Sequence, residues 1–323
     1  MLKSDNFNAV ASIQQFLTDH PELPKNKAAQ LKQAQYELVL TKASQNYAAQ
    51  LSRDLVLGNR DQQIEALSRL KKLGLITIPI IRDYIDAPDA LIRETAIDAI
   101  LTVGGAQTLP FVAERLKQEK DINVIHVGIK NLKDIGGDKS LEIIKTFLNH
   151  KDEDLVIASI SAIGKLLGGD NDDPFGDYGT SKSKKKARPE SLVIIKLLKD
   201  SRWRVRVAAL QYTAKQKVKE AKDDIIYLLE NDNDEFVRHH TIKTAVALNI
   251  KEAEATLKKL YLKNDEMVGS LTQAFIEMSD ALPPELLKHL KTRDPDTIIS
   301  SLKAFSSSDE DQLKILADFS RTK

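Results

Sequence analysis

The chain has 323 residues, with 48 Lys and Arg against 47 Asp and Glu, and no Cys. Its balanced charge creates no global field that would point to nucleic acid or a membrane surface as the partner. The lack of Cys excludes disulfides and thiolate metal sites. No apolar run approaches the roughly 18 residues of a membrane-spanning helix, so we expect a cytoplasmic protein.

The first 58 residues lie outside any clear repeat. A short amphipathic helix is predicted from Asn8 to Thr18, and the segment HPELP breaks it because two prolines bracket a turn. A long helix rich in Ala, Gln and Lys is predicted from Lys25 to Leu57. We interpret residues 1–58 as a helical cap on the array that follows, because the end of a repeat array needs a cover. A separate docking helix or a coiled-coil seam is the alternative.

From residue 59 onward, one pattern returns about every thirty residues, the period of a stacked repeat array. Its apolar anchor residues are Ile64, Ile92, Val124, Leu155, Val205, Val237, Val268 and Ile298. Three residues earlier, where a carboxylate can cap a helix start, stand Asp61, Asp89, Asp121, Asp152, Asp234 and Asp265. Four residues after the anchor come Ser68, Ala96, Gly128, Ser159, Ala209, Thr241, Thr272 and Leu302. All of these except Leu302 are small, which indicates close approach between neighbouring helices.

Each anchor helix is expected to end at a residue type that accepts the left-handed backbone conformation. The predicted ends are Gly104, Gly136, Gly168 and Asn249. A second apolar helix then follows, as in LPFVAERL and LEIIKTFL. One such pair cannot bury its apolar face alone, so neighbouring pairs must stack. The sequence therefore predicts an all-α solenoid of about eight helix pairs over residues 59–323.

This pattern resembles the HEAT family, in the thirty-residue form of the phycobilisome-lyase-type repeats. The resemblance covers about residues 59–319, including the Arg after the anchor at Arg93, Arg206 and Arg238. It implies a right-handed α-solenoid, a fold that usually serves as a platform for partner macromolecules. Two repeats depart from the pattern, because Arg202 and Pro295 stand where the others carry Asp.

An insertion separates Leu155 from Val205, which are 50 residues apart. The surplus is the segment 170–188, DNDDPFGDYGTSKSKKKAR, in which an acidic part precedes a basic part. Too little of it is apolar to order a core. We predict a mobile loop between the two helices of the fourth repeat and no domain boundary.

The binding site is predicted from charge and from the departures at the fifth repeat. Residues 152–177 carry a net charge of −6, and residues 182–222 carry +11. A cation at a helix start is disfavoured by the helix dipole, and a Trp among Arg side chains is typical of interface hot spots. We therefore predict one partner-binding site, called the basic patch below, formed by Lys184, Lys185, Lys186, Arg188, Arg202, Trp203 and Arg204. The alternative is that Trp203 packs under a neighbouring repeat while the Lys run is only solvated.

The sequence predicts no catalytic residue, metal or cofactor. None of the six His is followed by Glu, whereas the HEAT-repeat deoxyhypusine hydroxylases bind iron through His-Glu pairs. Phosphate-loop, dinucleotide-binding and zinc-protease motifs are absent as well. We predict a non-catalytic scaffold or adaptor for a partner protein, and an acidic protein segment would suit the basic patch. The alternatives are a binder of nucleic acid or another polyanion, and a phycobilin-lyase-like or glycosylase-like enzyme on a HEAT solenoid.

Overall fold

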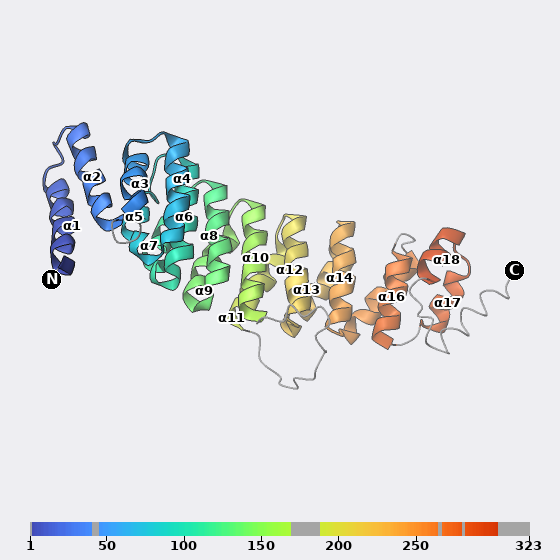
Figure 1. Ribbon diagram of the computed structural model, residues 1–323. Helices are drawn as coiled ribbons and strands as arrows, with labels where there is room; N and C mark the ends of the chain where they lie inside the picture. The colour runs from blue at the N-terminus through green and yellow to red at the C-terminus, as the bar shows by residue number, and fades with distance from the viewer. Residues whose placement is uncertain (1, 41–44, 169–187, 264–266, 280–281, 303–323) are drawn as a thin grey trace. The chain divides into compact units, whose positions relative to one another are not determined.

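The computed structural model describes residues 2–40, 45–168, 188–263, 267–279 and 282–302. Within these ranges every regular element is a helix (Figure 1). The chain divides into two compact units, Met1–Ala162 and Ile163–Lys323, and the division falls inside α10 (Glu153–Gly168). None of the helices in the described ranges combines the length and the hydropathy needed to cross a lipid bilayer.

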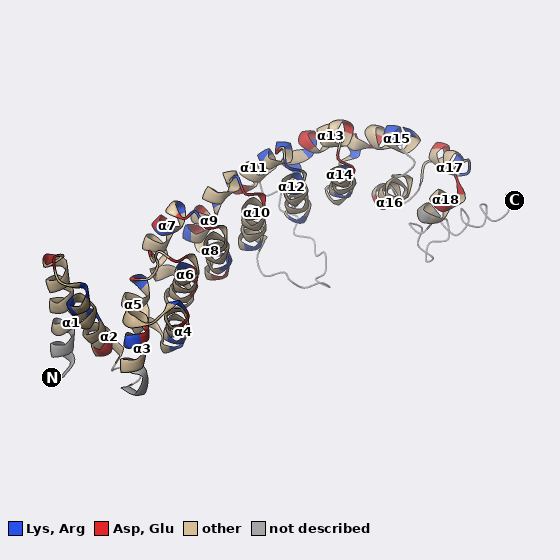
Figure 2. Ribbon diagram, turned by 90° about the horizontal axis from the view of Figure 1, so that it is seen from above, with Lys and Arg blue, Asp and Glu red and all other residues tan. Residues whose placement is uncertain are grey.

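The first unit begins with three helices and continues with helix pairs. The first three are α1 (Leu2–Asp19), α2 (Lys25–Leu40) and α3 (Gln45–Leu57). The pairs are α4 (Arg60–Leu70) with α5 (Ile78–Arg82), α6 (Ala90–Gly104) with α7 (Leu109–Gln118), and α8 (Ile122–Ile135) with α9 (Gly137–Lys145). Figure 2 shows α4, α6 and α8 in one layer and α5, α7 and α9 in the other.

The second unit repeats this two-layer arrangement. Its helices are α11 (Pro189–Lys196), α12 (Trp203–Lys215), α13 (Lys222–Asn231), α14 (Glu235–Ala247), α15 (Glu254–Lys263), α16 (Val268–Ser279), α17 (Pro284–Leu290) and α18 (Pro295–Leu302). Successive first helices pack on one another from α12 to α18, and α13, α15 and α17 do the same in the second layer (Figure 2). The predicted all-α solenoid is confirmed. We number its repeats from 1, which begins with α4, to 8, which begins with α18.

Four of the eight repeats begin as the sequence predicts, with an Asp as the N-cap. The Asp89 carboxylate, for example, accepts hydrogen bonds from the backbone N–H of Leu91 at 2.9 Å and Ile92 at 3.1 Å. Asp121, Asp152 and Asp234 cap α8, α10 and α14 in the same way, while the predicted cap Asp265 lies outside the described residues.

The predicted register is wrong in the first and last repeats. Asn59, and not Asp61, caps α4 in a reciprocal capping box with Gln62. Asp294, one residue before Pro295, caps α18 by accepting the N–H of Thr297 at 3.0 Å. In repeat 1 the error has a simple cause, because Asn caps a helix as well as Asp does. Asp61 lies within the first turn of α4, where it resembles the cap residue of the other repeats.

With the register corrected, the close-packing position is small in every repeat. It moves from Ser68 to Ala66 in repeat 1 and from Leu302 to Ser301 in repeat 8, and both new residues are buried. At Gly128 a methyl group would lie 2.7 Å from Cδ2 of Leu116 on α7. Buried Ser and Thr are accommodated because each hydroxyl donates to the carbonyl one turn earlier, as Thr241 does to Val237 at 2.7 Å. A larger side chain here would push neighbouring helices apart.

The N-terminal segment differs from its prediction. α1 begins at Leu2, well before Asn8. The single helix predicted from Lys25 to Leu57 is wrong, because α2 and α3 pack side by side and the Ser52 hydroxyl lies 3.4 Å from the Glu37 carboxylate. Fifteen residues along one helix would separate these groups by about 22 Å.

The predicted helix ends are confirmed at two positions and shifted at one. Gly136 and Asn249 adopt φ values of 75° and 51°. In repeat 2 the left-handed residue is Gly105, with φ of 50°, and Gly104 is still helical. The predicted insertion, apart from Arg188, lies outside the described residues.

The corrected register of repeat 1 can be tested with one matched pair of variants. We expect Ala66→Leu to lower the free energy of unfolding by about 1–3 kcal/mol, because the added methyl groups must enter a filled core. Ser68→Leu should change it by less than about 0.5 kcal/mol, because Ser68 is exposed. Urea unfolding followed by circular dichroism measures the free energy of unfolding of both variants. A larger loss in Ser68→Leu than in Ala66→Leu would show that Ser68, and not Ala66, packs inside.

Candidate interaction surface

The structure describes four of the seven residues of the predicted basic patch. Lys184, Lys185 and Lys186 lie outside the described residues. Arg188 is exposed at the start of α11, which packs against α12. Arg202 is the N-cap residue of α12, and the exposed Trp203 and Arg204 form its first turn. The described part of the basic patch therefore lies at the starts of two neighbouring helices.

Arg202 is held by a carboxylate two residues before it. Its Nε and Nη2 atoms each donate to Asp200 at 2.8 Å, and its backbone N–H donates to the same carboxylate at 2.9 Å. These hydrogen bonds lower the pKa of Asp200. The unusual cation at the helix start is thus half of a local ion pair, which explains Arg202 without a ligand.

Trp203 belongs to a row of rings that crosses from α12 to α14, of which the first two are exposed and the third is half-buried. Its ring centroid lies 5.8 Å from that of Phe236, and Phe236 lies 6.0 Å from His240. Trp203 is 43 % exposed and Phe236 is 63 % exposed. Burial, followed by the charge of Lys243, lowers the pKa of His240 from its ordinary value. We call Trp203, Phe236 and His240 the aromatic row.

Phe236 was missed in the sequence because it looks like a core residue. It directly precedes the buried anchor Val237, and an apolar pair at a helix start is usual in a repeat core. The available signal was helical geometry, because neighbouring residues of a helix point about 100° apart. With Val237 directed inward, Phe236 has to point away from the core.

In the described residues, consecutive repeats are joined at two places by a buried bridge in which one Arg donates two hydrogen bonds to a carboxylate. In the first unit, Arg93 on α6 donates through Nε and Nη2 to Glu119 at 2.8 and 3.0 Å, and through Nη1 to the carbonyls of Ala87 and Pro88. In the second unit, Arg206 on α12 binds Asp232 with the same two distances. The Glu119 and Asp232 side chains are only 2 % and 5 % exposed.

The acceptor in each bridge also fixes the loop before the next helix. Glu119 accepts the N–H of Asp121 at 2.9 Å, and Asp232 accepts that of Asp234 at 2.9 Å. Burial alone would raise the pKa of Glu119, but hydrogen bonds from Arg93 and the backbone N–H groups, together with the charge of Arg115, lower it to about 2. The sequence shows Arg93 and Arg206 at equivalent positions of the repeat but does not identify their partners.

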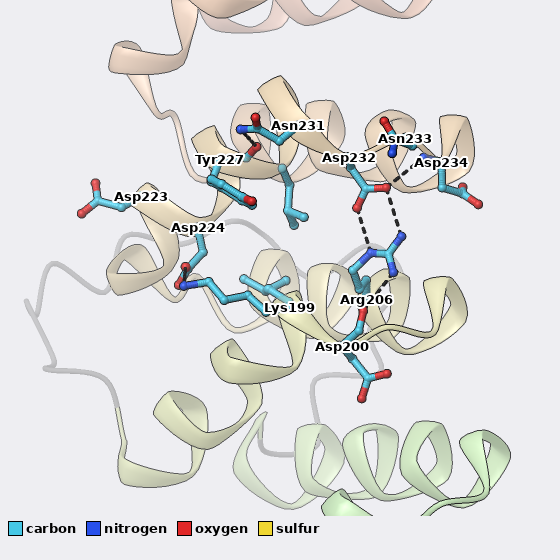
Figure 3. Close-up of a pocket in the computed structure, with 12 residues that line it drawn as sticks. Lys199, Asp200, Arg206, Asp223, Asp224, Tyr227, Asn231, Asp232, Asn233 and Asp234 are labelled. Carbon is cyan, nitrogen blue, oxygen red and sulfur yellow. Dashed lines mark hydrogen bonds and ion pairs between the residues drawn. The ribbon is translucent and has the colours of Figure 1, made fainter.

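An open pocket of about 1000 Å³ lies beside the bridge between Arg206 and Asp232 (Figure 3). Its walls come from the 3₁₀ turn Leu197–Lys199, from α13 and from the loop before α14. Lys199 binds Asp224 at 2.8 Å across its rim, and Tyr227 is 55 % exposed. The described ranges contain no group of three or more His, Asp or Glu side chains arranged to hold a metal ion.

The stacked helix pairs, the small residue inside each described first helix and the bridges between loops define an α-helical repeat protein. Residues 191–275 match the family model described as HEAT repeats. These residues therefore contain HEAT repeats, and the resemblance inferred from the anchors is confirmed for this family. No curated protein matches the chain significantly.

The low pKa of Glu119 predicts how stability depends on pH. Its carboxylate stabilises the fold above about pH 4.5, the value of an exposed Glu, and this contribution disappears as the pH falls toward 2. The contribution is on the order of 3 kcal/mol. We expect Glu119→Gln to lower the free energy of unfolding at pH 7 and to flatten its decline between pH 5 and 2.

The control is Glu114→Gln, because Glu114 lies on α7, which ends just before Glu119, and its side chain is 64 % exposed. Urea unfolding at a series of pH values should give this variant the slope of the wild type. A Glu119→Gln curve parallel to the wild type would contradict the low pKa.

Proposed function

We propose that this HEAT-repeat protein is a non-catalytic scaffold or adaptor, and that it binds a partner protein through the aromatic row and the adjoining basic patch. The observation that carries the proposal is the contact between the exposed rings of Trp203 and Phe236. Neighbouring exposed aromatic residues give a soluble protein an apolar patch that a partner can cover. Trp is among the residue types that dominate binding energy at interfaces, and so is Arg, which flanks it here as Arg204.

The ion pairs of the second unit favour a protein partner over a polyanion. Three cations in this region are paired with carboxylates, in the ion pairs Arg202–Asp200, Lys199–Asp224 and Lys222–Glu252. A phosphate backbone would have to compete with these carboxylates for the cations. A protein surface can instead cover the rings and match charges of both signs.

The use of the pocket carboxylates supports a non-catalytic role. Asp224 is paired with Lys199, Asp232 with Arg206, and Asp234 caps α14 by accepting the N–H of Val237 at 3.1 Å. Each of these groups thus has a structural task. Catalytic carboxylates, in contrast, are usually held where a reacting group can approach them.

The proposal includes residues 1–58 as the cap of the solenoid and a cytoplasmic location, as predicted from the sequence. Contacts between the N-terminal helices and repeat 1 support the cap. The Tyr36 hydroxyl donates to Asp83 at 2.6 Å, the Tyr84 hydroxyl donates to the carbonyl of Leu55 at 2.8 Å, and Leu55 is fully buried. These contacts cover the apolar face that repeat 1 would otherwise expose.

The test is affinity capture from the native organism with the immobilised full chain, followed by binding measurements on the protein recovered. We expect Trp203→Ala combined with Phe236→Ala to weaken this binding by about thirtyfold, because a hot spot contributes about 2 kcal/mol or more. Circular dichroism must show unchanged helix content in the double variant.

Tyr227→Ala is the matched control, because Tyr227 is similarly exposed but lies on α13. Binding that resists the double variant, or that falls equally in Tyr227→Ala, would remove the aromatic row as the site. Retention on heparin at physiological salt that the double variant abolishes would favour the polyanion alternative.

A further inference from the structure

The bridge that joins consecutive repeats is incomplete at Arg238. This residue follows the anchor of repeat 6, as Arg93 and Arg206 follow theirs. Its Nη1 atom donates to the carbonyl of Asp232, six residues earlier, at 3.3 Å. In the same way, Nη1 of Arg93 donates to the carbonyl of Ala87, and Nη1 of Arg206 donates to that of Asp200. The guanidinium of Arg238 is therefore placed like the other two.

The carboxylate-binding edge of Arg238 has no acceptor in the described structure. In Arg93 and Arg206, Nε and Nη2 both donate to the carboxylate of the next loop. The Nε atom of Arg238 is buried and makes no hydrogen bond. Leaving a buried donor unsatisfied costs about 1–3 kcal/mol, so an acceptor placed there would stabilise the folded chain.

The cause lies in the residue that occupies the acceptor position. Counting five residues back from the next anchor gives Glu119 for Arg93, Asp232 for Arg206, and Lys263 for Arg238. At two further loops the same position accepts the N–H of the following N-cap residue, through His150 at 3.0 Å and Asp200 at 2.9 Å. Lys has no acceptor atom. Lys263 therefore cannot serve this position, and it brings a positive charge where Glu119 and Asp232 bring a negative one.

We propose that Arg238 and Lys263 form a binding site for a side-chain carboxylate from an acidic segment of the partner protein. At the two equivalent positions of this chain, Arg93 binds Glu119 and Arg206 binds Asp232. A side-chain carboxylate is therefore the ligand that fits Arg238. Two cations complement one or more acidic residues, and Arg binds a carboxylate through two parallel hydrogen bonds. This inference rests on the proposed protein-binding function and adds the chemistry of the partner.

The first test measures binding of a fluorescently labelled hexaglutamate peptide to the full chain by anisotropy. We expect Arg238→Gln and Lys263→Asp each to weaken binding by about tenfold. Lys259→Asp is the matched control, since Lys259 is an exposed Lys one turn earlier on α15. It should retain binding within about twofold of the wild type, since long-range charge effects between exposed groups are screened by salt.

The second test needs no ligand. Lys263→Asp restores the missing acceptor, so its thermal midpoint should rise by about 2–4 °C relative to Lys263→Gln. This gain should disappear in the Arg238→Gln background, because the new carboxylate would then lack its partner. Lys259→Asp should give no such gain.

Three results would overturn the inference. The first is equal peptide binding by the wild type and Arg238→Gln, together with equal midpoints for Lys263→Asp and Lys263→Gln. The second is peptide binding that appears only after Asp265 and Glu266 are changed to amides, because the chain would then fill the site itself. The third is binding lost only in the aromatic-row double variant, which would leave the proposed function standing and place the acidic segment on α12 and α14.

Discussion

The arrangement of successive repeats depends on a guanidinium that holds two loops at once. Arg206 donates to the carbonyls of Asp200 and Ser201 in the loop before its own helix, and to Asp232 in the following loop. Asp232 in turn accepts the N–H at the next helix start. The position of one helix start therefore fixes that of the next. Because the pair is largely buried, loss of one partner would leave an uncompensated charge, at a cost of about 3–5 kcal/mol.

Features that depend on local chemistry were predictable from the sequence, and features that depend on distant contacts were not. The caps at Asp89 and Asp121 and the small residues inside the helices follow from the preferences of a single helix start or a single packing position. The separation of α2 from α3 could not be predicted in this way, because no Gly or Pro marks it. Its evidence is the contact between Ser52 and Glu37, which exists only in the folded chain.

The candidate site was predicted in part, and its residues show why. Trp203 was identified because a lone Trp is conspicuous, whereas Phe236 was hidden among apolar core positions. Arg202 was assigned to a partner although Asp200, two residues earlier, was available as its counter-ion. A residue that breaks a repeat pattern has to be compared first with its sequence neighbours. The same comparison applied to Lys263 finds Asp265 and Glu266, which lie outside the described residues.

The incomplete bridge at Arg238 also has a consequence for the mechanics of the second unit. In a repeat array the free energy is close to a sum of terms for each repeat and for each interface between neighbours. Among the described residues, the interface between α14 and α16 lacks the ion pair that the interface between α12 and α14 has, so its free-energy term is smaller. Local opening begins where such a term is smallest. We therefore expect the interface between α14 and α16 to open before the interface between α12 and α14, the two helices that carry the aromatic row.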